Sequence, residues 1–229
     1  MSNRFITAAL TLFLTLPATA DTIAVIGTGD VGGALGPAFS KQGHTIIYGS
    51  RDPERGKVRQ LVELTANGAS ATTQAEAAAQ ADIVVLAVPG MLVEEITLAL
   101  GDLSGKIIID PTNPLQRKLT RFVHAVDTSN AEIIQAAAPD AFVVKAFNTL
   151  NWKTMVDPSS AGGPVSIPLA GDNGRAKKKV AELVTGMGLE PIDVGSVEDA
   201  HWVEGMLMLW INNRYGSMRN SFDYYLRRN

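Results

Sequence analysis

The chain has 229 residues, of which 46% are hydrophobic, and its 20 Lys and Arg against 23 Asp and Glu give a formal net charge of −3. This composition allows a sizeable buried core and excludes a disordered chain. Because the charge is slightly acidic and no basic block occurs, nucleic acid is not expected as a partner. The chain has no cysteine, which excludes disulfides and thiolate metal ligands.

Residues 1–20 have the pattern of a secretory signal peptide. Arg4 supplies a positive charge, Phe5 to Leu16 is an apolar stretch, and Ala-Thr-Ala at residues 18–20 forms a cleavage site before Asp21. The alternative is an uncleaved membrane anchor, although the apolar stretch is short for a span. The segment predicts export, to the periplasm, with a cytoplasmic or N-terminally anchored chain as the alternative.

The next stretch predicts half of a dinucleotide-binding site. Thr22 to Ile26 is an apolar run typical of a strand buried on both faces, and a helix is expected from Asp30. Between them, Gly27, Gly29 and Gly32 have G-x-G-x-x-G spacing, which permits a tight turn, close approach of a pyrophosphate and close helix packing. The phosphates would lie on free N–H groups at the helix start. The alternative is a turn with a structural role alone.

A second strand is predicted from His44 to Tyr48, and the adenine ribose would lie at its end. NAD-binding sites usually carry Asp or Glu there, to bind the ribose 2′-hydroxyl. This chain has Ser50 and Arg51 instead, which can donate to a 2′-phosphate and therefore predict a preference for NADP(H). In the alternative, Arg51 is a solvated loop charge and Asp52 or Glu54 reaches the ribose.

Four further strands, separated by helices, predict an α/β fold with a Rossmann-type, doubly wound, mostly parallel sheet. In such a sheet the strand ends face the cofactor, so Val88 and Pro89 are expected to wall the nucleotide. Asn113, in a rigid turn, either covers the nicotinamide ribose or is an ordinary turn residue. The strands are Ala69–Thr72, Ala81–Pro89, Lys106–Asp110 and Phe142–Phe147, and the helices are Pro53–Asn67, Gln74–Gln80, Leu92–Leu100 and Asn130–Ala138.

The region after residue 160 has a different character. Strands are expected at Val165–Ala170 and Glu190–Val194, and helices at Arg175–Met187 and Glu198–Asn213. The predicted organisation is therefore a signal peptide (1–20), an NADP-binding Rossmann domain (21–160) and a small C-terminal α/β extension packed on that domain (161–229).

Several segments together resemble the deazaflavin-dependent NADP oxidoreductase family, whose members move a hydride between NADPH and coenzyme F-420 (F420). The chain looks still closer to the related NADPH-binding reductase domain of the six-transmembrane metalloreductases, over about residues 22–212. The segments are G-T-G-D-V-G, Y-G-S-R-D-P, V-V-K-A-F-N-T-L, L-A-G-D-N, M-G-L-E-P-I-D-V-G-S-V and W-V-E-G-M-L.

The resemblance implies phosphate contacts in the glycine-rich turn, a 2′-phosphate clamp, and an electron-acceptor pocket at Asn148, Thr149 and Leu150 under the last helix around Met206. Asp30 is unfavourable on charge grounds beside phosphates, yet it resembles the metalloreductase branch. The candidate cofactor-binding residues are thus Gly27, Thr28, Gly29, Asp30, Val31, Gly32, Ser50, Arg51, Val88, Pro89 and Asn113.

No acid–base residue is predicted, because a nicotinamide passes hydride to a stacked flavin-like ring directly. The three histidines, His44, His124 and His201, lack metal-ligand spacing. Each is expected to be a surface or core residue, and no metal site is predicted.

The predicted function is an NADPH-dependent oxidoreductase that transfers a hydride between NADP(H) and a small-molecule acceptor, either F420 or a flavin (FAD or FMN). The alternative is an exported NADPH-binding sensor or redox-complex subunit without turnover. A 3-hydroxyacid or 6-phosphogluconate type dehydrogenase would need a long all-helical C-terminal domain, which the strands after residue 160 argue against. The sequence leaves two possible partners open, a second copy of the chain in a homodimer and a membrane-associated redox partner. The predicted export conflicts with the predicted cofactor, because NADPH is made in the cytoplasm.

Overall fold

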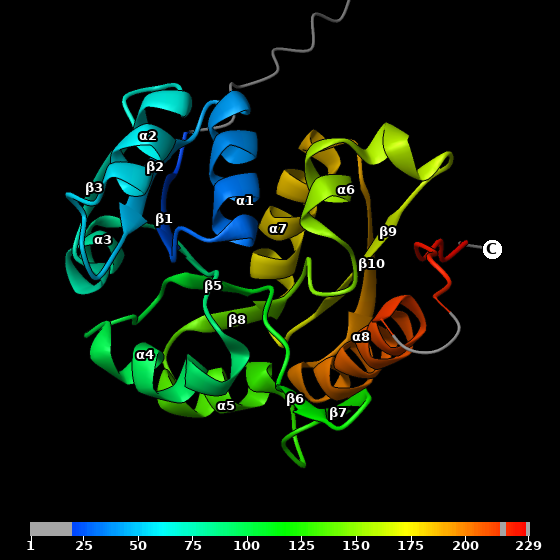
Figure 1. Cartoon of the computed structure of the whole chain (residues 1–229). Coiled ribbons are helices and arrows are strands. Elements are labelled where there is room, and N and C mark those ends of the chain that lie inside the picture. The colour runs from blue at the N-terminus through cyan, green and yellow to red at the C-terminus, as the bar shows by residue number, and fades with distance from the viewer. Residues whose placement is uncertain (1–19, 216–218, 228–229) are drawn as a thin grey trace, which may run out of the picture.

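The computed structural model describes residues 20–215 and 219–227 (Figure 1). The predicted signal peptide therefore lies outside the described residues, except for Ala20. The centre of the fold is an eight-stranded sheet in the order β10-β9-β8-β5-β4-β1-β2-β3. The strands are β1 (Thr22–Ile26), β2 (Thr45–Gly49), β3 (Ser70–Thr72), β4 (Ile83–Leu86), β5 (Ile107–Asp110), β8 (Phe142–Lys145), β9 (Ser166–Ala170) and β10 (Glu190–Gly195).

Neighbouring strands of this sheet run parallel, except that β9 pairs with β8 in the antiparallel sense, at Lys145 and Ala170. The predicted Rossmann-type, mostly parallel sheet is confirmed. Strands β9 and β10 come from the predicted C-terminal extension, and they continue the same sheet. The division of the chain at residue 160 stays a prediction.

Helices cover both faces of the sheet, and each face has its own hydrophobic core. The cluster on one face includes α1, α6 and α7, and the cluster on the other includes α3, α4, α5 and the start of α8. Figure 1 shows α1 and α7 above the sheet and α4 and α5 below it. The helices are α1 (Asp30–Lys41), α2 (Gly56–Leu64), α3 (Gln74–Gln80), α4 (Val93–Ala99), α5 (Asn130–Ala137), α6 (Trp152–Val156), α7 (Gly174–Gly186) and α8 (Ala200–Tyr215), with short 3₁₀ turns η1 (Gly90–Leu92), η2 (Pro158–Ala161) and η3 (Val197–Asp199).

Strand β1 shows why its sequence is apolar throughout. Ile23 and Val25 belong to the core on the α1 face, whereas Ala24 and Ile26 belong to the opposite core, and all four are fully buried. A parallel strand between two helical layers has no solvated face, so it carries no alternating polar residues. Because β1, β2, β4 and β5 run parallel, their carboxyl ends meet at one edge of the sheet.

Two helix starts are set by reciprocal side-chain caps. At α3 the Thr73 hydroxyl accepts from the Glu76 N–H, and the Glu76 carboxylate accepts from the Thr73 N–H at 3.2 Å. Ser129 and Glu132 do the same for α5. Capping boxes of this kind satisfy backbone donors that the helix itself leaves free, which fixes where α3 and α5 begin.

The sequence analysis missed a small hairpin after the predicted rigid turn. Strands β6 (Leu115–Lys118) and β7 (Arg121–His124) pair with each other in a separate two-stranded sheet. Helix α8 holds this hairpin in place, because Asn212 bonds both the N–H and the C=O of Phe122, at 2.9 and 3.0 Å. Leu207, Trp210 and Ile211 of the same helix form a third apolar cluster against the hairpin.

The described end of the chain packs on the fold. The Ser166 N–H donates to the Tyr224 carbonyl at 2.8 Å, and the Leu226 N–H donates to the Ser166 hydroxyl at 2.8 Å. The Tyr224 hydroxyl donates to the carbonyl of Met206, at 2.7 Å. The tail therefore joins β9 to α8.

Within residues 20–215 and 219–227, no helix has the length and apolar character that crossing a membrane requires. The same residues contain no group of three or more His, Asp or Glu side chains placed to hold a metal ion.

The packing of α1 on β2 gives a stability prediction. A Cβ at Gly36 would lie 2.1 Å from the Tyr48 hydroxyl oxygen, whereas a Cβ at Gly33 meets its nearest atom, in Leu61, at 3.9 Å. Gly36→Ala should therefore lower the free energy of unfolding by about 1 to 3 kcal/mol through overpacking. Gly33→Ala should raise it by up to about 1 kcal/mol through helix propensity. Urea unfolding of both variants measures this, and equal effects would contradict the packing described.

Candidate functional site

Two glycines where β1 leads into α1, Gly27 in the turn and Gly32 in the first turn of the helix, have no room for a side chain. Gly27 has a φ of +105°, and a Cβ there would lie 2.2 Å from the Ala87 carbonyl oxygen. A Cβ at Gly32 would lie 2.0 Å from the Gly27 carbonyl oxygen. At Gly29, by contrast, a Cβ would meet no atom within 4 Å. Gly27 and Gly32 thus pack directly against protein atoms, whereas the space next to Gly29 is free of them.

Gly29 is also the N-cap of α1, and no side chain caps the helix there. The first turn of an α-helix carries N–H groups without intrahelical partners, and the helix dipole is positive at this end. An uncapped helix start that borders open space suits an anionic ligand such as a pyrophosphate. Asp30, exposed in the first turn of α1, adds a negative charge beside this place.

A cavity of about 730 Å³ extends from the turn along the strand ends. Seven of the predicted cofactor-binding residues line it: Gly27, Thr28, Gly29, Ser50, Arg51, Val88 and Pro89. Asp30, Val31, Gly32 and Asn113 do not line it. Asp52, named in the alternative for the ribose, also lines the cavity. The remaining lining residues were not predicted from the sequence, and they are Gly49, Arg55, Lys57, Gln74, Ala87, Leu92, Glu95, Ile96 and Ala99.

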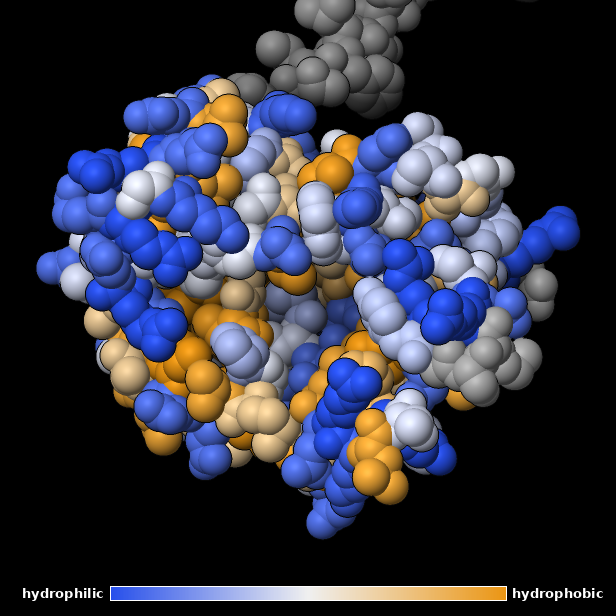
Figure 2. Space-filling model, in the orientation of Figure 1, coloured by the Kyte–Doolittle hydropathy of each residue, from blue (hydrophilic) through white to orange (hydrophobic). Residues whose placement is uncertain are grey.

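One rim of the cavity carries three cations, Arg51, Arg55 and Lys57. All three are exposed, and none lies within 4.0 Å of a carboxylate in the part of the chain that the structure describes. Leu92 and Ile96, from η1 and α4, also line the cavity, together with the acidic Glu95. In Figure 2 hydrophilic side chains over α2 accordingly face hydrophobic ones over α4. The cavity is therefore lined by three cations, by the carboxylates of Asp52 and Glu95, and by the apolar side chains of η1 and α4.

Ser50 is bound within its own loop. Its hydroxyl donates to the Asp52 carbonyl at 3.0 Å and accepts from the Asp52 N–H at 3.2 Å. A small loop of this kind holds residues 50–52 in a turn, so the Arg51 backbone is placed by its neighbours on both sides. To donate to a phosphate, the Ser50 hydroxyl has to rotate away from the Asp52 carbonyl.

Of the predicted acceptor residues, Asn148, Thr149 and Leu150 follow β8 and Met206 lies on α8, while the predicted cofactor residue Asn113 follows β5. The Asn148 amide donates to the Asn113 Oδ1 at 3.0 Å and to the Val203 carbonyl at 3.3 Å, while Asn113 donates back to the Asn148 carbonyl at 3.2 Å. The structure thus brings Asn113, Asn148 and α8 together. Val203 precedes Met206 by three residues, about one turn of α8.

Two oxygen atoms in this region have no partner among the described residues, namely Oδ1 of Asn148 and Oγ1 of Thr149. Both residues are buried, at 3% and 1% exposure. Just before them Phe147 has a φ of +65°, a left-handed conformation that costs energy in a bulky residue. Buried unpaired oxygens and a strained backbone both concentrate at functional sites. Leu150 is buried beside them, at 7%.

The two halves of the site are neighbours. Gly90 directly follows the cavity residue Pro89, and a Cβ at Gly90 would lie 2.0 Å from the Asn113 carbonyl oxygen. The Asn130 side chain also donates to the Gly90 carbonyl, at 3.0 Å. The cavity wall formed by residues 88–90 therefore touches the loop that carries Asn113.

Four charged or ionisable side chains lie behind the acceptor residues, and the sequence analysis assigned them no role. Lys145, at the end of β8, contacts the carboxylates of Asp110 and Glu204, and His124 contacts Glu204 from the other side. Lys145, Asp110 and Glu204 are fully buried. The one sequence signal was Lys145 itself, a cation inside the apolar segment F-V-V-K-A-F.

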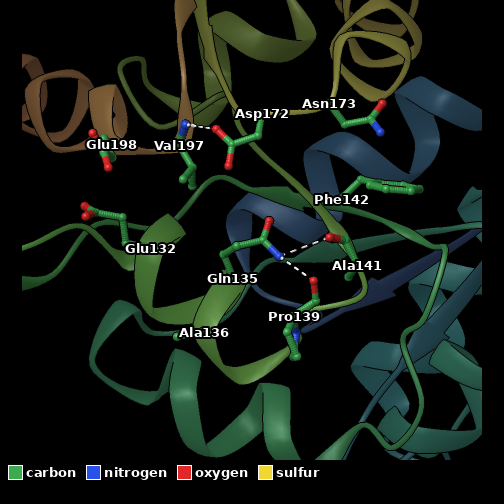
Figure 3. A pocket seen from close by; sticks show the side chains of 10 residues that line it. All are labelled: Glu132, Gln135, Ala136, Pro139, Ala141, Phe142, Asp172, Asn173, Val197 and Glu198. Carbon is green, nitrogen blue, oxygen red and sulfur yellow. Dashed lines mark hydrogen bonds between the residues drawn. The ribbon is translucent and has the colours of Figure 1, made fainter.

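A second hollow, of about 630 Å³, lies between α5 and η3 at the opposite edge of the sheet (Figure 3). The Asp172 carboxylate accepts from the Val197 N–H at 2.9 Å, and the Gln135 amide donates to the carbonyls of Pro139 and Ala141. None of the predicted site residues lines this hollow. Because these polar groups are engaged in the fold, the hollow is a surface depression and not the candidate site.

Residues 22–114, which include the turn and most of the cavity, match the family described as NADP oxidoreductase, coenzyme F420-dependent. The F420-dependent NADP reductase of Methanothermobacter marburgensis is 32% identical over 219 residues, which cover 87% of this chain and 95% of that protein. The chain belongs to the F420-dependent NADP oxidoreductase family. It is accordingly a member of an NADP-binding oxidoreductase family.

Two further relatives support the assignment. The solved structure of a protein assigned as an F420-dependent NADP reductase from Arthrobacter sp. FB24 is 33% identical, with a TM-score of 0.80, and the match covers 90% of this chain and 100% of that one. The metalloreductase STEAP3 of Rattus norvegicus is 31% identical over 192 residues, or 83% of this chain. Those residues are 37% of that protein, so the chain spans about a third of the length of the metalloreductase relatives.

Proposed function

We propose that the chain is an NADPH-dependent reductase that transfers a hydride between NADP(H) and a flavin or deazaflavin acceptor, F420 being the first candidate. The observation that carries the proposal is the cavity of about 730 Å³, which joins the glycine-rich turn to the three cations Arg51, Arg55 and Lys57. A dinucleotide with a 2′-phosphate matches both ends of this cavity, with its pyrophosphate above Gly29 and its extra phosphate at Arg51, Arg55 and Lys57.

The residues present fit such a cofactor. The open space above Gly29 and the uncapped start of α1 suit the pyrophosphate, and the cationic rim neutralises a phosphate that a carboxylate would repel. When bound, the nicotinamide supplies the hydride chemistry, and the protein binds and orients it. Val88 and Pro89 form the wall next to Asn113, on the side where the acceptor would lie.

On the acceptor side, the proposal assigns the pocket to Asn148, Thr149, Leu150 and Met206. Its support is the pair of buried oxygens without partners, on Asn148 and Thr149, beside the strained Phe147. Amide and hydroxyl groups can bind the carboxamide of a nicotinamide or the edge of a flavin-like ring. Direct hydride transfer needs both rings held a few ångströms apart away from water, so these residues would position the rings and need not exchange a proton.

The pattern of residues 1–20 leads us to propose that the protein is exported. Asp21, which would become the first residue after cleavage, is tied to the fold: its N–H donates to His44 at 3.1 Å, and its carboxylate contacts the Lys179 ammonium at 2.6 Å. Cleavage after Ala20 would thus leave these contacts in place. A membrane-associated redox partner and a homodimer belong to the same proposal.

The cationic rim gives a first prediction. Replacing Arg51 by Ala removes a charge-assisted hydrogen bond worth about 1.5 to 3 kcal/mol, so NADPH binding should weaken about tenfold or more. NADH binding should be nearly unchanged. Arg59→Ala is the matched control, because Arg59 lies on α2, shortly after the Arg51 loop, is likewise exposed, and does not line the cavity. Titration calorimetry with both cofactors measures this, and equal losses for NADPH and NADH would refute the clamp.

Turnover tests the proposed reaction itself. Nicotinamide absorbance is followed while the protein is mixed with NADPH and, in separate reactions, F420, FAD, FMN and a ferric chelate. Rapid oxidation with one acceptor, and little with NADH, is expected. If NADPH binds and is oxidised no faster than in the buffer blank with every acceptor, the sensor or redox-subunit function replaces the reductase.

The export proposal predicts the N-terminus of the native protein. Intact-mass measurement of protein purified from its own host should show a chain that begins at Asp21. A chain that retains Met1, or residues 2–20, would rule out cleavage after Ala20.

A further inference from the structure

Four ionisable side chains from four different elements meet behind the acceptor side. The Lys145 ammonium lies 2.6 Å from the Asp110 carboxylate and 2.5 Å from Oε1 of Glu204. Nε2 of His124 lies 2.8 Å from Oε2 of Glu204. The side chains of Lys145, Asp110 and Glu204 are 0% exposed, and that of His124 is 17% exposed.

The hydrogen bonds of His124 require one proton more than a neutral histidine and an ionised Glu204 contain. Nδ1 of His124 lies 2.7 Å from the Val126 carbonyl oxygen, which can only accept. Nε2 faces a carboxylate oxygen, and an ionised carboxylate also only accepts. A neutral imidazole has a single N–H, so it cannot serve both contacts. Either both ring nitrogens carry a proton, or Glu204 is protonated and donates to Nε2.

Charge balance leads to the same conclusion independently. With His124 neutral and Glu204 ionised, the cluster holds one cation, Lys145, and two anions, Asp110 and Glu204. A buried net charge of −1 is costly, because little water can solvate it. One added proton on either His124 or Glu204 makes the whole cluster neutral.

We propose that the His124–Glu204 pair holds one proton in the folded protein at neutral pH, and that in this state it positions α8 and the β6–β7 hairpin against the ends of β5 and β8. Those strand ends lead into Asn113 and Asn148, the acceptor side of the reaction proposed above. Any consequence of this pair for catalysis rests on the proposed reductase function. The proton shared by the pair, and its positioning of α8 and the hairpin, do not depend on that function.

The contacts around Glu204 show what the pair positions. Oε1 of Glu204 accepts from the Asn130 N–H at 2.9 Å, and the neighbouring Val203 carbonyl accepts from Asn148. The Lys145 ammonium donates to the Thr112 carbonyl at 2.7 Å, one residue before Asn113. Helix α8 is thus joined to the loop after β5, the start of α5 and the end of β8.

Three other titratable groups lie near the pair. Lys145 from β8 and Asp110 from β5 face Glu204, and the His201 ring, one turn earlier on α8, lies 5.0 Å from the His124 ring. Burial raises the pKa of Glu204, which the attraction of Lys145 opposes and the repulsion of Asp110 reinforces. A raised pKa in the folded state means that the proton stabilises the fold at low pH, and that this stabilisation is lost as pH rises through the folded-state pKa.

Glu204→Gln is a near-isosteric variant that separates the proton from the hydrogen bonds. Its carboxamide oxygen can accept from Lys145 and from the Asn130 N–H, while its amide group donates to Nε2 of a neutral His124 that keeps its proton on Nδ1. Every contact is then retained and the cluster is neutral without the extra proton. Glu198→Gln is the matched control, since Glu198 is exposed in η3 and makes the same change in charge.

The test uses the full chain labelled with ¹⁵N at its three histidines, with ring nitrogens observed by NMR, and infrared spectroscopy of the carboxylic acid C=O band. At pH 7 the proposal predicts either a doubly protonated His124 or a neutral His124 with a protonated Glu204. In Glu204→Gln, and not in Glu198→Gln, His124 should be neutral with its proton on Nδ1. A neutral His124 beside an ionised Glu204 at pH 7 would overturn the proposal.

Positioning is tested by amide hydrogen exchange and urea unfolding of the same three proteins between pH 6 and pH 10. As the pair loses its proton, the wild type and Glu198→Gln should exchange faster in α8 and the hairpin, with α1 and α3 unchanged after correction for intrinsic rates, and their urea midpoint should fall. Glu204→Gln should lack both changes. An equal pH response in all three proteins, or a response spread evenly over the fold, would refute the positioning role.

Discussion

The turn at the end of β1 is the constraint on which the nucleotide half of the structure depends. The backbone of Gly27 approaches the Ala87 carbonyl so closely that any Cβ would collide with it, and the Gly27 N–H donates to the Gly49 carbonyl at 3.0 Å. The ends of β1, β2 and β4 are therefore locked together at one point. The cavity opens from that point, with the start of α1 on one side and the end of β4 on the other.

The acceptor half is organised differently. Its polar residues sit at the ends of β5 and β8, and their positions are held by side chains that are far apart in sequence. Asn113 and Asn148 share two hydrogen bonds, while the charged cluster beneath them joins α8 to the sheet. Rigid backbone packing thus shapes the nucleotide cavity, and buried polar contacts shape the region next to it.

This difference explains how much the sequence could predict. The G-x-G-x-x-G turn, its flanking strand and helix, and the polar end of β2 are local patterns, and sequence spacing was enough to find them. Arg55 and Lys57 were missed because they fall within the helix predicted from Pro53, and helical spacing alone does not show that the start of this helix borders the cavity. The contact of His124 with Glu204 spans 80 residues and depends on where α8 crosses the hairpin, so no local period could reveal it.

Sequence patterns also predicted the strands of the eight-stranded sheet, but not the separate hairpin of β6 and β7. Buried strands such as β1 and β4 are almost entirely apolar and easily recognised, whereas β6 and β7 contain Lys or Arg at three of their eight positions. The hairpin is stable because α8 packs on it, through Asn212 and an apolar cluster. Its strand character therefore depends on tertiary contacts more than on the propensity of its residues.

The C-terminal segment has a consequence for self-association. Strand β9 extends beyond the single residue pair that it shares with β8, so part of its backbone lies where β8 offers no partner. Residues 224–226 occupy that stretch, since the Ser166 N–H is bonded to the Tyr224 carbonyl. Unpaired strand backbone is a template for a strand of another molecule. Residues 224–226 thus cover this stretch of backbone, and a chain shortened before Tyr224 would leave it exposed.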